Sequence, residues 1–228
     1  MRVSMAGLFP VFASLMRGIT VAIVMVAMLF GSAQEVRAMS FPDIRSPILD
    51  EAVSSLVKKG AISGYPDGSF KAEKTINRAE ALKIIFALKQ INLSSGGEAG
   101  RFRDVDKKAW YFPYISEALR RKIVTGYPDG SFKPEKTVNK AEFLKMAFIA
   151  QDWYQDRSDP YDAMEQYADL NNDEWFTPFV AFGFNKGLLD KTTKLFPNKG
   201  ISWGEAVIIL ARVSKEDDLY LTPRIPFD

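Results

Sequence analysis

Two cationic side chains are each followed by an alanine and a glutamate, in Arg78-Ala79-Glu80 and in Lys140-Ala141-Glu142. An asparagine precedes each of them, and Asn-x-x-Glu is a capping-box pattern that begins a helix. The helix dipole disfavours a cation at the first helical position by roughly 0.3 to 1 kcal/mol. Arg78 and Lys140 therefore need a compensating partner. The cation and free N–H groups together hold an anionic ligand such as a carboxylate, or the cation pairs with a nearby acidic side chain.

Two tryptophans, Trp110 and Trp175, each stand just before an expected helix start. An indole can stack on a sugar ring because it offers a large apolar face and leaves a polar edge free. The alternative is hydrophobic anchoring of the helix start. Asp104 stands in an aromatic-x-Asp-apolar segment, where an aspartate organises the loop entering the helix or contacts a ligand.

The composition excludes most familiar catalytic sites. The chain has no Cys and no His, which removes thiol nucleophiles, imidazole bases, disulfides and zinc sites built on these residues. A hydrolase with Glu142 and Asp129 as paired carboxylates is the remaining enzymatic alternative, but both residues already have structural duties. Residues 169–174 resemble the start of a calcium loop, except that Glu174 stands where the sharp turn needs Gly. We expect no enzyme, no metal site and no cofactor.

The first 38 residues read as a signal peptide. Arg17 precedes an apolar run over residues 19–30, and small residues follow it up to Ala38. An uncleaved anchor is the alternative, although the run is short for a span of about 20 residues. The rest of the chain has equal numbers of basic and acidic side chains, so nucleic-acid binding is not expected. We predict export and no membrane span after cleavage.

The residues that could bind a ligand belong to a unit that the chain repeats. Residues 64–80 recur 62 positions later as residues 126–142, and an eroded third copy ends at Glu205. Each copy has an aromatic-x-Asp opening, a short amphipathic helix, a turn, and a capped helix that is apolar on most of its circumference. This pattern predicts an all-α fold of three helix-turn-helix repeats, with the second helices buried as a central three-helix bundle.

The predicted boundaries follow the copies. They are 1–38 for the signal peptide, 39–92, 102–152 and 167–215 for the repeats, 93–101 and 153–166 for the linkers, and 216–228 for the tail. The third copy departs most, because residues 191–194 replace Gly-Tyr-Pro-Asp and Trp203 takes the place of the helix-start cation. In the first copy, Ile48 falls where Trp is expected.

These motifs resemble the S-layer homology domain family over essentially all of the chain after the signal peptide. The matching elements are the Phe-x-Asp-Val opening, Trp at the first helix, Gly-Tyr-x-Asp-Gly-x-Phe-x-Pro, and Arg78-Ala79-Glu80 with its counterpart Lys140-Ala141-Glu142. The resemblance implies three tandem copies in a pseudo-threefold prism. It also implies attachment to the cell envelope through secondary cell-wall polysaccharide, often pyruvylated, or peptidoglycan-linked glycan, in grooves between copies.

Our leading hypothesis is a non-catalytic envelope protein that binds anionic glycan. The candidate ligand-binding residues are Arg78, Lys140, Trp110, Trp175, Asp104, Gly64 and Gly126. The alternative is a structural or interaction module that binds an S-layer or other envelope protein without binding glycan.

Overall fold

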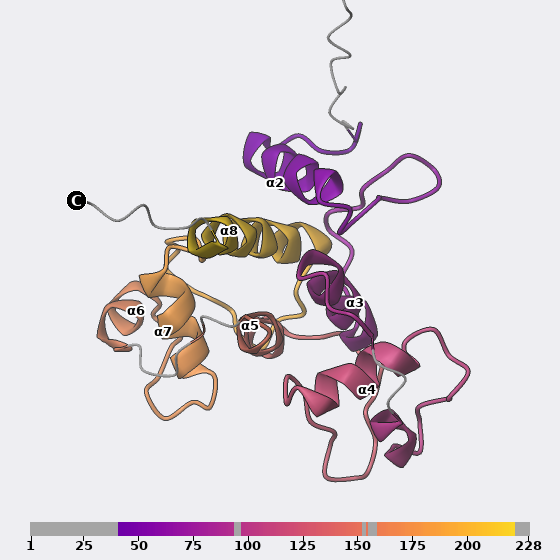
Figure 1. Ribbon diagram of the computed structural model, residues 1–228. Coiled ribbons are helices and arrows are strands. Elements are labelled where there is room, and N and C mark those ends of the chain that lie inside the picture. Colours follow the sequence, from indigo (N-terminus) through magenta and orange to yellow (C-terminus); the bar gives the residue numbers. More distant parts are fainter. Residues whose placement is uncertain (1–40, 94–96, 152–153, 155–158, 222–228) are drawn as a thin grey trace, which may run out of the picture. The chain divides into compact units, whose positions relative to one another are not determined.

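The regular secondary structure of the described residues is helical. The computed structural model describes residues 41–93, 97–151, 154 and 159–221. The first helices of the repeats are α2 (Pro47–Lys58), α4 (Phe112–Arg120) and α7 (Thr177–Asn185), and the second helices are α3 (Arg78–Leu88), α5 (Lys140–Ile149) and α8 (Trp203–Leu221) (Figure 1). Within these ranges the only strand-like pairings are three isolated β-bridges. The predicted all-α class is confirmed, while the predicted signal peptide lies outside the described residues.

Each first helix begins with a proline in its first turn and ends at a left-handed residue. The left-handed positions are Gly60, Lys122 and Gly187, with φ of 71°, 60° and 68°. The next amide then bonds back to the helix, as Ile123 N does to Ala118 O at 2.9 Å. This is the usual way to satisfy the last carbonyls of a helix. The left-handed residue therefore marks the end of each first helix.

Each second helix begins with the predicted capping box. Glu80 N donates to Asn77 Oδ1 at 2.8 Å, and Asn77 N donates to the Glu80 carboxylate at 2.8 Å. The same pair of bonds joins Asn139 to Glu142 and Ser202 to Glu205. The three glutamates are thus cap partners, as their spacing predicted.

An aspartate closes the loop between the two helices of each repeat. Asp104 accepts hydrogen bonds from the amides of Phe132 at 2.8 Å and Lys133 at 2.7 Å. Asp43 and Asp169 accept from the corresponding pairs of amides in the other repeats. The second amide always belongs to a residue with positive φ, 58° at Lys133. The aspartate therefore holds a backbone conformation that a non-glycine residue adopts at a cost.

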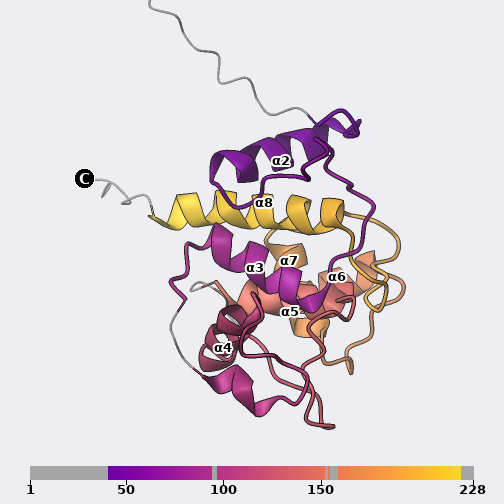
Figure 2. The same ribbon diagram turned by 90° about the vertical axis from the view of Figure 1, so that its right-hand side faces the viewer.

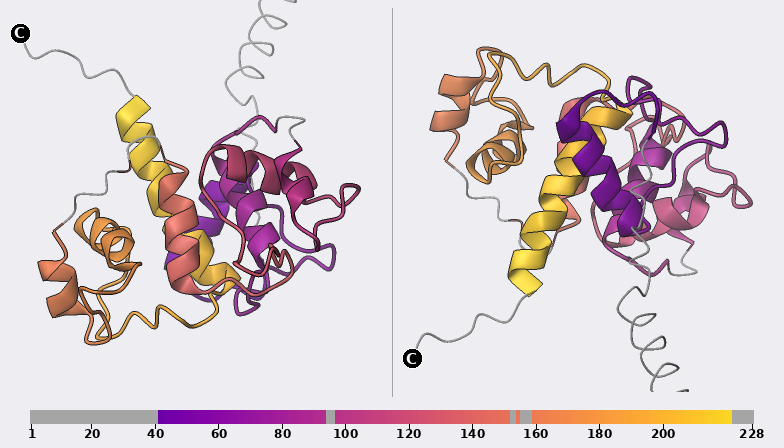
Figure 3. Two further views of the ribbon diagram at one scale, coloured as in Figure 1. Left: turned by 90° about the horizontal axis from the view of Figure 1, so that it is seen from below. Right: turned by 90° about the horizontal axis from the view of Figure 1, so that it is seen from above.

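The first helix of one repeat packs on the second helix of another. Helix α4 packs on α3, α7 packs on α5, and α2 packs on α8, so the order closes on itself. Figure 2 shows α2 running along α8 and α4 lying against α3. Both views of Figure 3 show α6 (Tyr161–Gln166) beside α7. Because each repeat covers its neighbour, the three repeats form one core.

A ring of backbone hydrogen bonds joins the three repeats just before their second helices. Ile76 N donates to Ile201 O at 3.2 Å, Val138 N to Ile76 O at 3.1 Å, and Ile201 N to Val138 O at 3.1 Å. All three side chains are fully buried. Helix α3 contacts both α5 and α8. The same kind of hydrogen bond thus joins each pair of repeats in the ring. The arrangement of the whole chain as a pseudo-threefold prism stays a prediction.

The segments between repeats, and the described residues after 215, contain more structure than expected. The predicted linker 93–101 includes a 3₁₀ helix, η1 (Glu98–Arg101), whose Ala99 is fully buried. Helix α8 continues past the predicted boundary at residue 215. Asp217 pairs with Lys89 at 3.1 Å and Asp218 with Lys59 at 2.9 Å, so partners from the first repeat hold the extra turn. No helix in the described ranges is long and apolar enough to cross a membrane.

Candidate functional site

Three of the cavities at the junctions between repeats include the first residue of a second helix, and each of the three is named after that residue. The Arg78 groove has a volume of about 230 Å³, the Trp203 groove about 280 Å³ and the Lys140 groove about 390 Å³. The walls of the first two are built alike, since residues 123–127, 142, 145 and 146 of the Arg78 groove correspond to residues 61–65, 80, 83 and 84 of the Trp203 groove, 62 positions earlier. The grooves are therefore repeated versions of one site.

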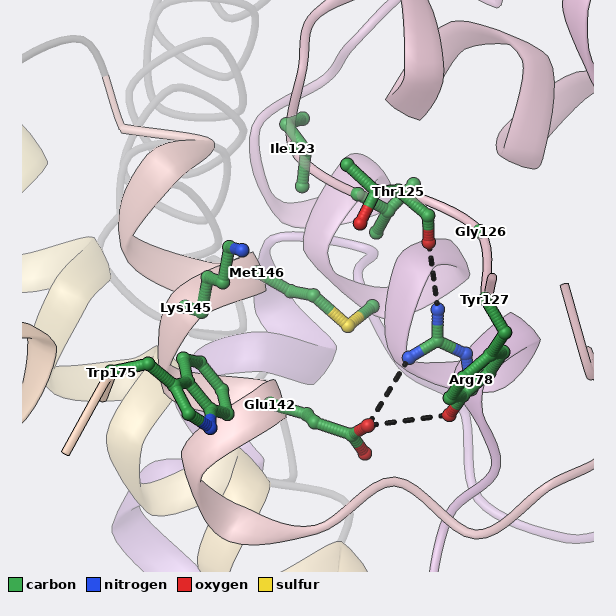
Figure 4. Close-up of a pocket in the computed structure, with 10 residues that line it drawn as sticks. Arg78, Ile123, Thr125, Gly126, Tyr127, Glu142, Lys145, Met146 and Trp175 are labelled. Carbon is green, nitrogen blue, oxygen red and sulfur yellow. Dashed lines mark hydrogen bonds and ion pairs between the residues drawn. The ribbon is translucent and has the colours of Figure 1, made fainter. Parts of the chain in front are cut away.

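The Arg78 groove takes residues from all three repeats. Arg78 comes from the first, Tyr127, Glu142 and Lys145 from the second, and Trp175 from the third. Figure 4 shows Trp175 and Lys145 on the side of the cavity opposite Arg78 and Tyr127. This set can form only when the repeats are assembled.

Arg78 is held firmly by the protein itself. Its side chain is 6% exposed; Nε donates to Phe132 O at 3.1 Å and Nη2 to Thr125 O at 3.3 Å. Nη1 lies 3.6 Å from the Glu142 carboxylate. The guanidinium also lies 5.1 Å from the ring centroid of Tyr127. These partners from the second repeat supply the compensation that a cation at a helix start requires.

The amides at the helix starts are also occupied. Arg78 N donates to Lys136 O and Ala79 N to Pro134 O, both at 3.0 Å, and the third amide of α3 is capped by Asn77. The starts of α5 and α8 are satisfied in the same way by carbonyls of another repeat. The amides at these helix starts are therefore not free to bind an anion.

Lys145 and Trp175 are the more accessible part of the Arg78 groove. Trp175 is 51% exposed, and Lys145 Nζ lies 5.6 Å from its ring centroid. Trp175 also makes edge contacts with Phe176 and Phe179, so it anchors the helix start as well as lining the groove. The anchoring role of this tryptophan is therefore seen, and its stacking on a sugar ring stays a prediction.

The Trp203 groove contains the predicted residues Gly64 and Trp110. Trp110 is 48% exposed and has Lys83 Nζ 5.3 Å from its ring centroid, which repeats the Lys145 and Trp175 arrangement. Trp203 stands where Arg78 stands in the first groove. Its indole Nε1 donates to Tyr65 Oη at 3.1 Å.

The Lys140 groove is the most divergent of the three. Lys140 Nζ donates to Leu195 O at 2.9 Å and pairs with Glu205 at 2.9 Å, so it is bound in the same manner as Arg78. Ile208 replaces the lysine found at positions 83 and 145, and none of the tryptophans among the described residues lines this groove. Ile48, which stands in the place of the missing tryptophan, is 61% exposed and is not part of the groove.

The remaining predicted residues have clear structural roles. Asp104 lines none of the three grooves, and its contact with a ligand stays a prediction. A Cβ atom on Gly126 would lie 2.0 Å from the Phe102 ring, and one on Gly64 would lie 2.2 Å from the Phe41 ring. Both glycines therefore admit a buried aromatic ring while their backbone lines a groove.

Four groove residues were not predicted from the sequence: Lys83, Lys145, Tyr65 and Tyr127. Each pair recurs at a spacing of 62, which is the only signal that could have marked them. The lysines are the polar positions of otherwise apolar helix segments.

Formal charge differs among the grooves. The Arg78 groove has two cations and one carboxylate, the Trp203 groove has Lys83 and Glu80 only, and the Lys140 groove has four cations and two carboxylates. These side chains leave formal charges of +1, 0 and +2. Burial raises the pKa of the Glu205 carboxyl, but hydrogen bonds from Lys140 and Ser202 outweigh it and hold that pKa below its usual value. Glu205 therefore stays ionised beside Lys140.

Comparison with known proteins agrees with this architecture. Residues 40–82 and 101–144 match the model of the S-layer homology domain. The chain is 30% identical over 159 residues to a cellulosome-anchoring protein of Acetivibrio thermocellus, covering 66% of this chain and 34% of that protein. It is 29% identical over 194 residues to S-layer protein EA1 of Bacillus anthracis, covering 83% of this chain and 22% of that protein. The chain thus spans about a third or less of the length of these relatives.

The class defined by the fold is that of tandem two-helix repeats joined by a backbone ring. The two matching repeats, residues 40–82 and 101–144, belong to the S-layer homology domain family, which in these relatives occurs in anchoring and S-layer proteins. The matched ranges are the first two repeats. The third repeat has the same capping box, aspartate contacts and ring bond in the structure.

Proposed function

We propose that this chain attaches to the cell envelope by binding an anionic glycan in the Arg78 groove, without catalysis. The observation that carries the proposal is that Arg78, Lys145 and the half-exposed Trp175 line one cavity although they come from three repeats. A carboxylate ligand, such as the pyruvyl ketal of a secondary cell-wall polysaccharide, fits this set. Lys145 would supply the direct charge, Arg78 the fixed positive field, and Trp175 an apolar face for the sugar ring.

The Lys140 groove is a second candidate for an acidic unit of the same polymer. It has the higher formal charge, but no indole lines it. We therefore expect it to contribute charge attraction with less sugar stacking. Repeats arranged as a pseudo-threefold prism would present the grooves around one axis, so that one polymer could reach more than one of them.

The test is retention of the purified chain on isolated cell-wall sacculi, before and after removal of the wall polysaccharide. We expect Lys145→Ala and Trp175→Ala to lower retention about tenfold each, the usual effect of truncating a central contact. Lys108→Ala is the matched control, because Lys108 is exposed and lines no described groove. Undiminished retention of the double variant Arg78→Lys, Lys145→Ala would refute the proposed groove.

The same experiment separates the alternatives. Retention on sacculi stripped of polysaccharide would instead favour an S-layer or envelope protein partner. Release of reducing sugar from the wall would revive the hydrolase alternative. Against it, hydrogen bonds from Ser131 and an ion pair with Lys133 hold the pKa of Asp129 well below its usual range. A general acid needs a raised pKa, so Asp129 is unsuited to that role.

A further inference from the structure

The Trp203 groove differs from the Arg78 groove at one chemically decisive position. The glycine, tyrosine, glutamate and lysine of the wall and the tryptophan of the next repeat are the same in both grooves. The other lining positions exchange uncharged residues, and Phe70 is added in the Trp203 groove, so the change from Arg78 to Trp203 is the one that alters a charged side chain. Backbone bonds fix both positions in the same way, since Trp203 N donates to Lys74 O at 2.8 Å as Arg78 N donates to Lys136 O at 3.0 Å.

This exchange changes what the groove can bind. With Lys83 and Glu80 as its charged side chains, the Trp203 groove has no net formal charge. It gains a second indole that is held in place by the bond to Tyr65 and by a ring contact with Phe70 at 6.2 Å between centroids. Trp110, 48% exposed, lines the same cavity. Two indoles in one neutral cavity favour a ligand with apolar faces and no charge.

We infer that the Trp203 groove binds an uncharged pyranose unit. The axial C–H bonds of a pyranose give it an apolar face that can lie on an indole, while Glu80, Lys83 and the Tyr65 hydroxyl can bond its hydroxyl or acetamido groups. The Trp203 groove has no arginine to compensate the charge of an acidic sugar, so an acidic sugar should bind less well here than in the Arg78 groove. This inference rests on the proposed function. It assigns the neutral unit of a wall glycan to one groove and the acidic unit to another.

The experiment follows the tryptophan indole N–H signals of the full, ¹⁵N-labelled chain by NMR. The chain has four tryptophans, so each signal can be assigned by single substitution. N,N′-diacetylchitobiose is the neutral probe, and a methyl glycoside carrying a 4,6-pyruvyl ketal is the acidic probe. We expect the neutral probe to shift the signals of Trp110 and Trp203 and to leave that of Trp175 in place, and the acidic probe to do the reverse.

Two variants make the result specific. Trp110→Ala removes a half-exposed ring, and should weaken the neutral probe about tenfold at the Trp203 signal. Trp203→Arg recreates the set found in the Arg78 groove, and should move the Trp110 response from the neutral to the acidic probe. A matched melting temperature of Trp110→Ala and the parent chain shows that the loss comes from the groove.

The outcomes distinguish the two claims. If the acidic probe shifts Trp175 while the neutral probe leaves Trp203 unmoved, the inference fails and the proposed function stands. An acidic probe that shifts Trp203 as strongly as Trp175 also overturns the inference. If neither probe shifts any indole signal and the chain is not retained on sacculi, the proposed function fails and the inference fails with it.

Discussion

Replacing Arg78 with alanine should destabilise the fold as well as the groove. The substitution removes two hydrogen bonds from a charged donor, to Phe132 O at 3.1 Å and Thr125 O at 3.3 Å, and it leaves the Glu142 carboxylate without the guanidinium 3.6 Å away. Hydrogen bonds to charged groups contribute about 1.5 to 3 kcal/mol each. Because one of the two is long, we take the lower end and expect a loss of about 3 kcal/mol.

The second repeat supplies the matched control. Lys140 occupies the corresponding position and bonds one carbonyl, Leu195 O, and the Glu205 carboxylate, both at 2.9 Å. Arg78→Lys should therefore keep one carbonyl bond and the ion pair, and cost about half as much as Arg78→Ala. Lys145→Ala changes a groove cation that donates to no carbonyl, so it should cost less than about 0.5 kcal/mol.

Urea unfolding of the four proteins, followed by circular dichroism, measures this series. We expect the urea midpoint to fall in the order parent chain, Lys145→Ala, Arg78→Lys, Arg78→Ala. The slope of the free energy of unfolding with urea concentration should be the same in all four proteins. Retention on sacculi should follow a different order, with Lys145→Ala well below Arg78→Lys. An unchanged midpoint for Arg78→Ala would show that the bonds between repeats add no net stability, and would refute this reasoning.

Three further predictions concern stability. Lys122→Gly should raise the free energy of unfolding by roughly 1 kcal/mol, because Lys122 has a φ of 60° where the other two repeats have Gly60 and Gly187. Thermal melting measures this change, and Gly60→Lys should lower the free energy of unfolding. The pKa of Glu205 is lowered from 4.5 in the folded state, so the stability that its carboxylate contributes is complete above pH 4.5. It is lost as the pH falls through the folded-state pKa, and the urea midpoint of Glu205→Gln should therefore change less with pH over that range than the midpoint of the parent chain. Burial raises the pKa of Tyr167 from 10.0 to about 12, so the neutral phenol contributes to the free energy of unfolding, on the order of 2 kcal/mol. This contribution is complete below pH 10 and is lost as the pH rises through 12, so the free energy of unfolding of Tyr167→Phe should fall less at alkaline pH than that of the parent chain.

Local structure could be predicted from the sequence because local chemistry determines it. The capping boxes at Asn77, Asn139 and Ser202 depend on side chains three residues apart, and the positions of Gly60 and Gly187 mark helix ends by their left-handed conformation. The inward position of Phe132 follows from the turn that precedes it, and this side chain is fully buried. Each of these features depends on a single segment of the chain, and the capping boxes were predicted in this way.

The grooves could not be predicted in the same way, because their residues come from different repeats. Nothing local indicates that Trp175 faces Lys145, or that Arg78 reaches Thr125 O and Phe132 O. The extension of α8 beyond residue 215 has the same origin, since Asp217 is held by Lys89 of the first repeat. Only the packing of one repeat on the next decides these contacts.

The backbone ring explains how the repeats can differ in their groove residues and still share one fold. The ring positions Ile76, Val138 and Ile201 are apolar and fully buried, and the first two amides of each second helix are satisfied by carbonyls of another repeat. These bonds need no particular side chain at the helix start. Arginine, lysine and tryptophan therefore occupy that position in turn, at residues 78, 140 and 203.

Charge at the helix start is thus decoupled from assembly. A cation there is stabilised by carbonyls and a glutamate of the neighbouring repeat, and the tryptophan is stabilised by Tyr65 and Phe70. Each helix-start side chain is stabilised by partners next to it, so exchanging one side chain for another alters the groove without disturbing the ring. It follows that Trp203→Arg should fold with its ring intact, and that the amides of Ile76, Val138 and Ile201 should be as protected from hydrogen exchange as they are in the parent chain. Loss of that protection in a chain that still contains its helices would show that the helix-start side chain and the ring are coupled after all.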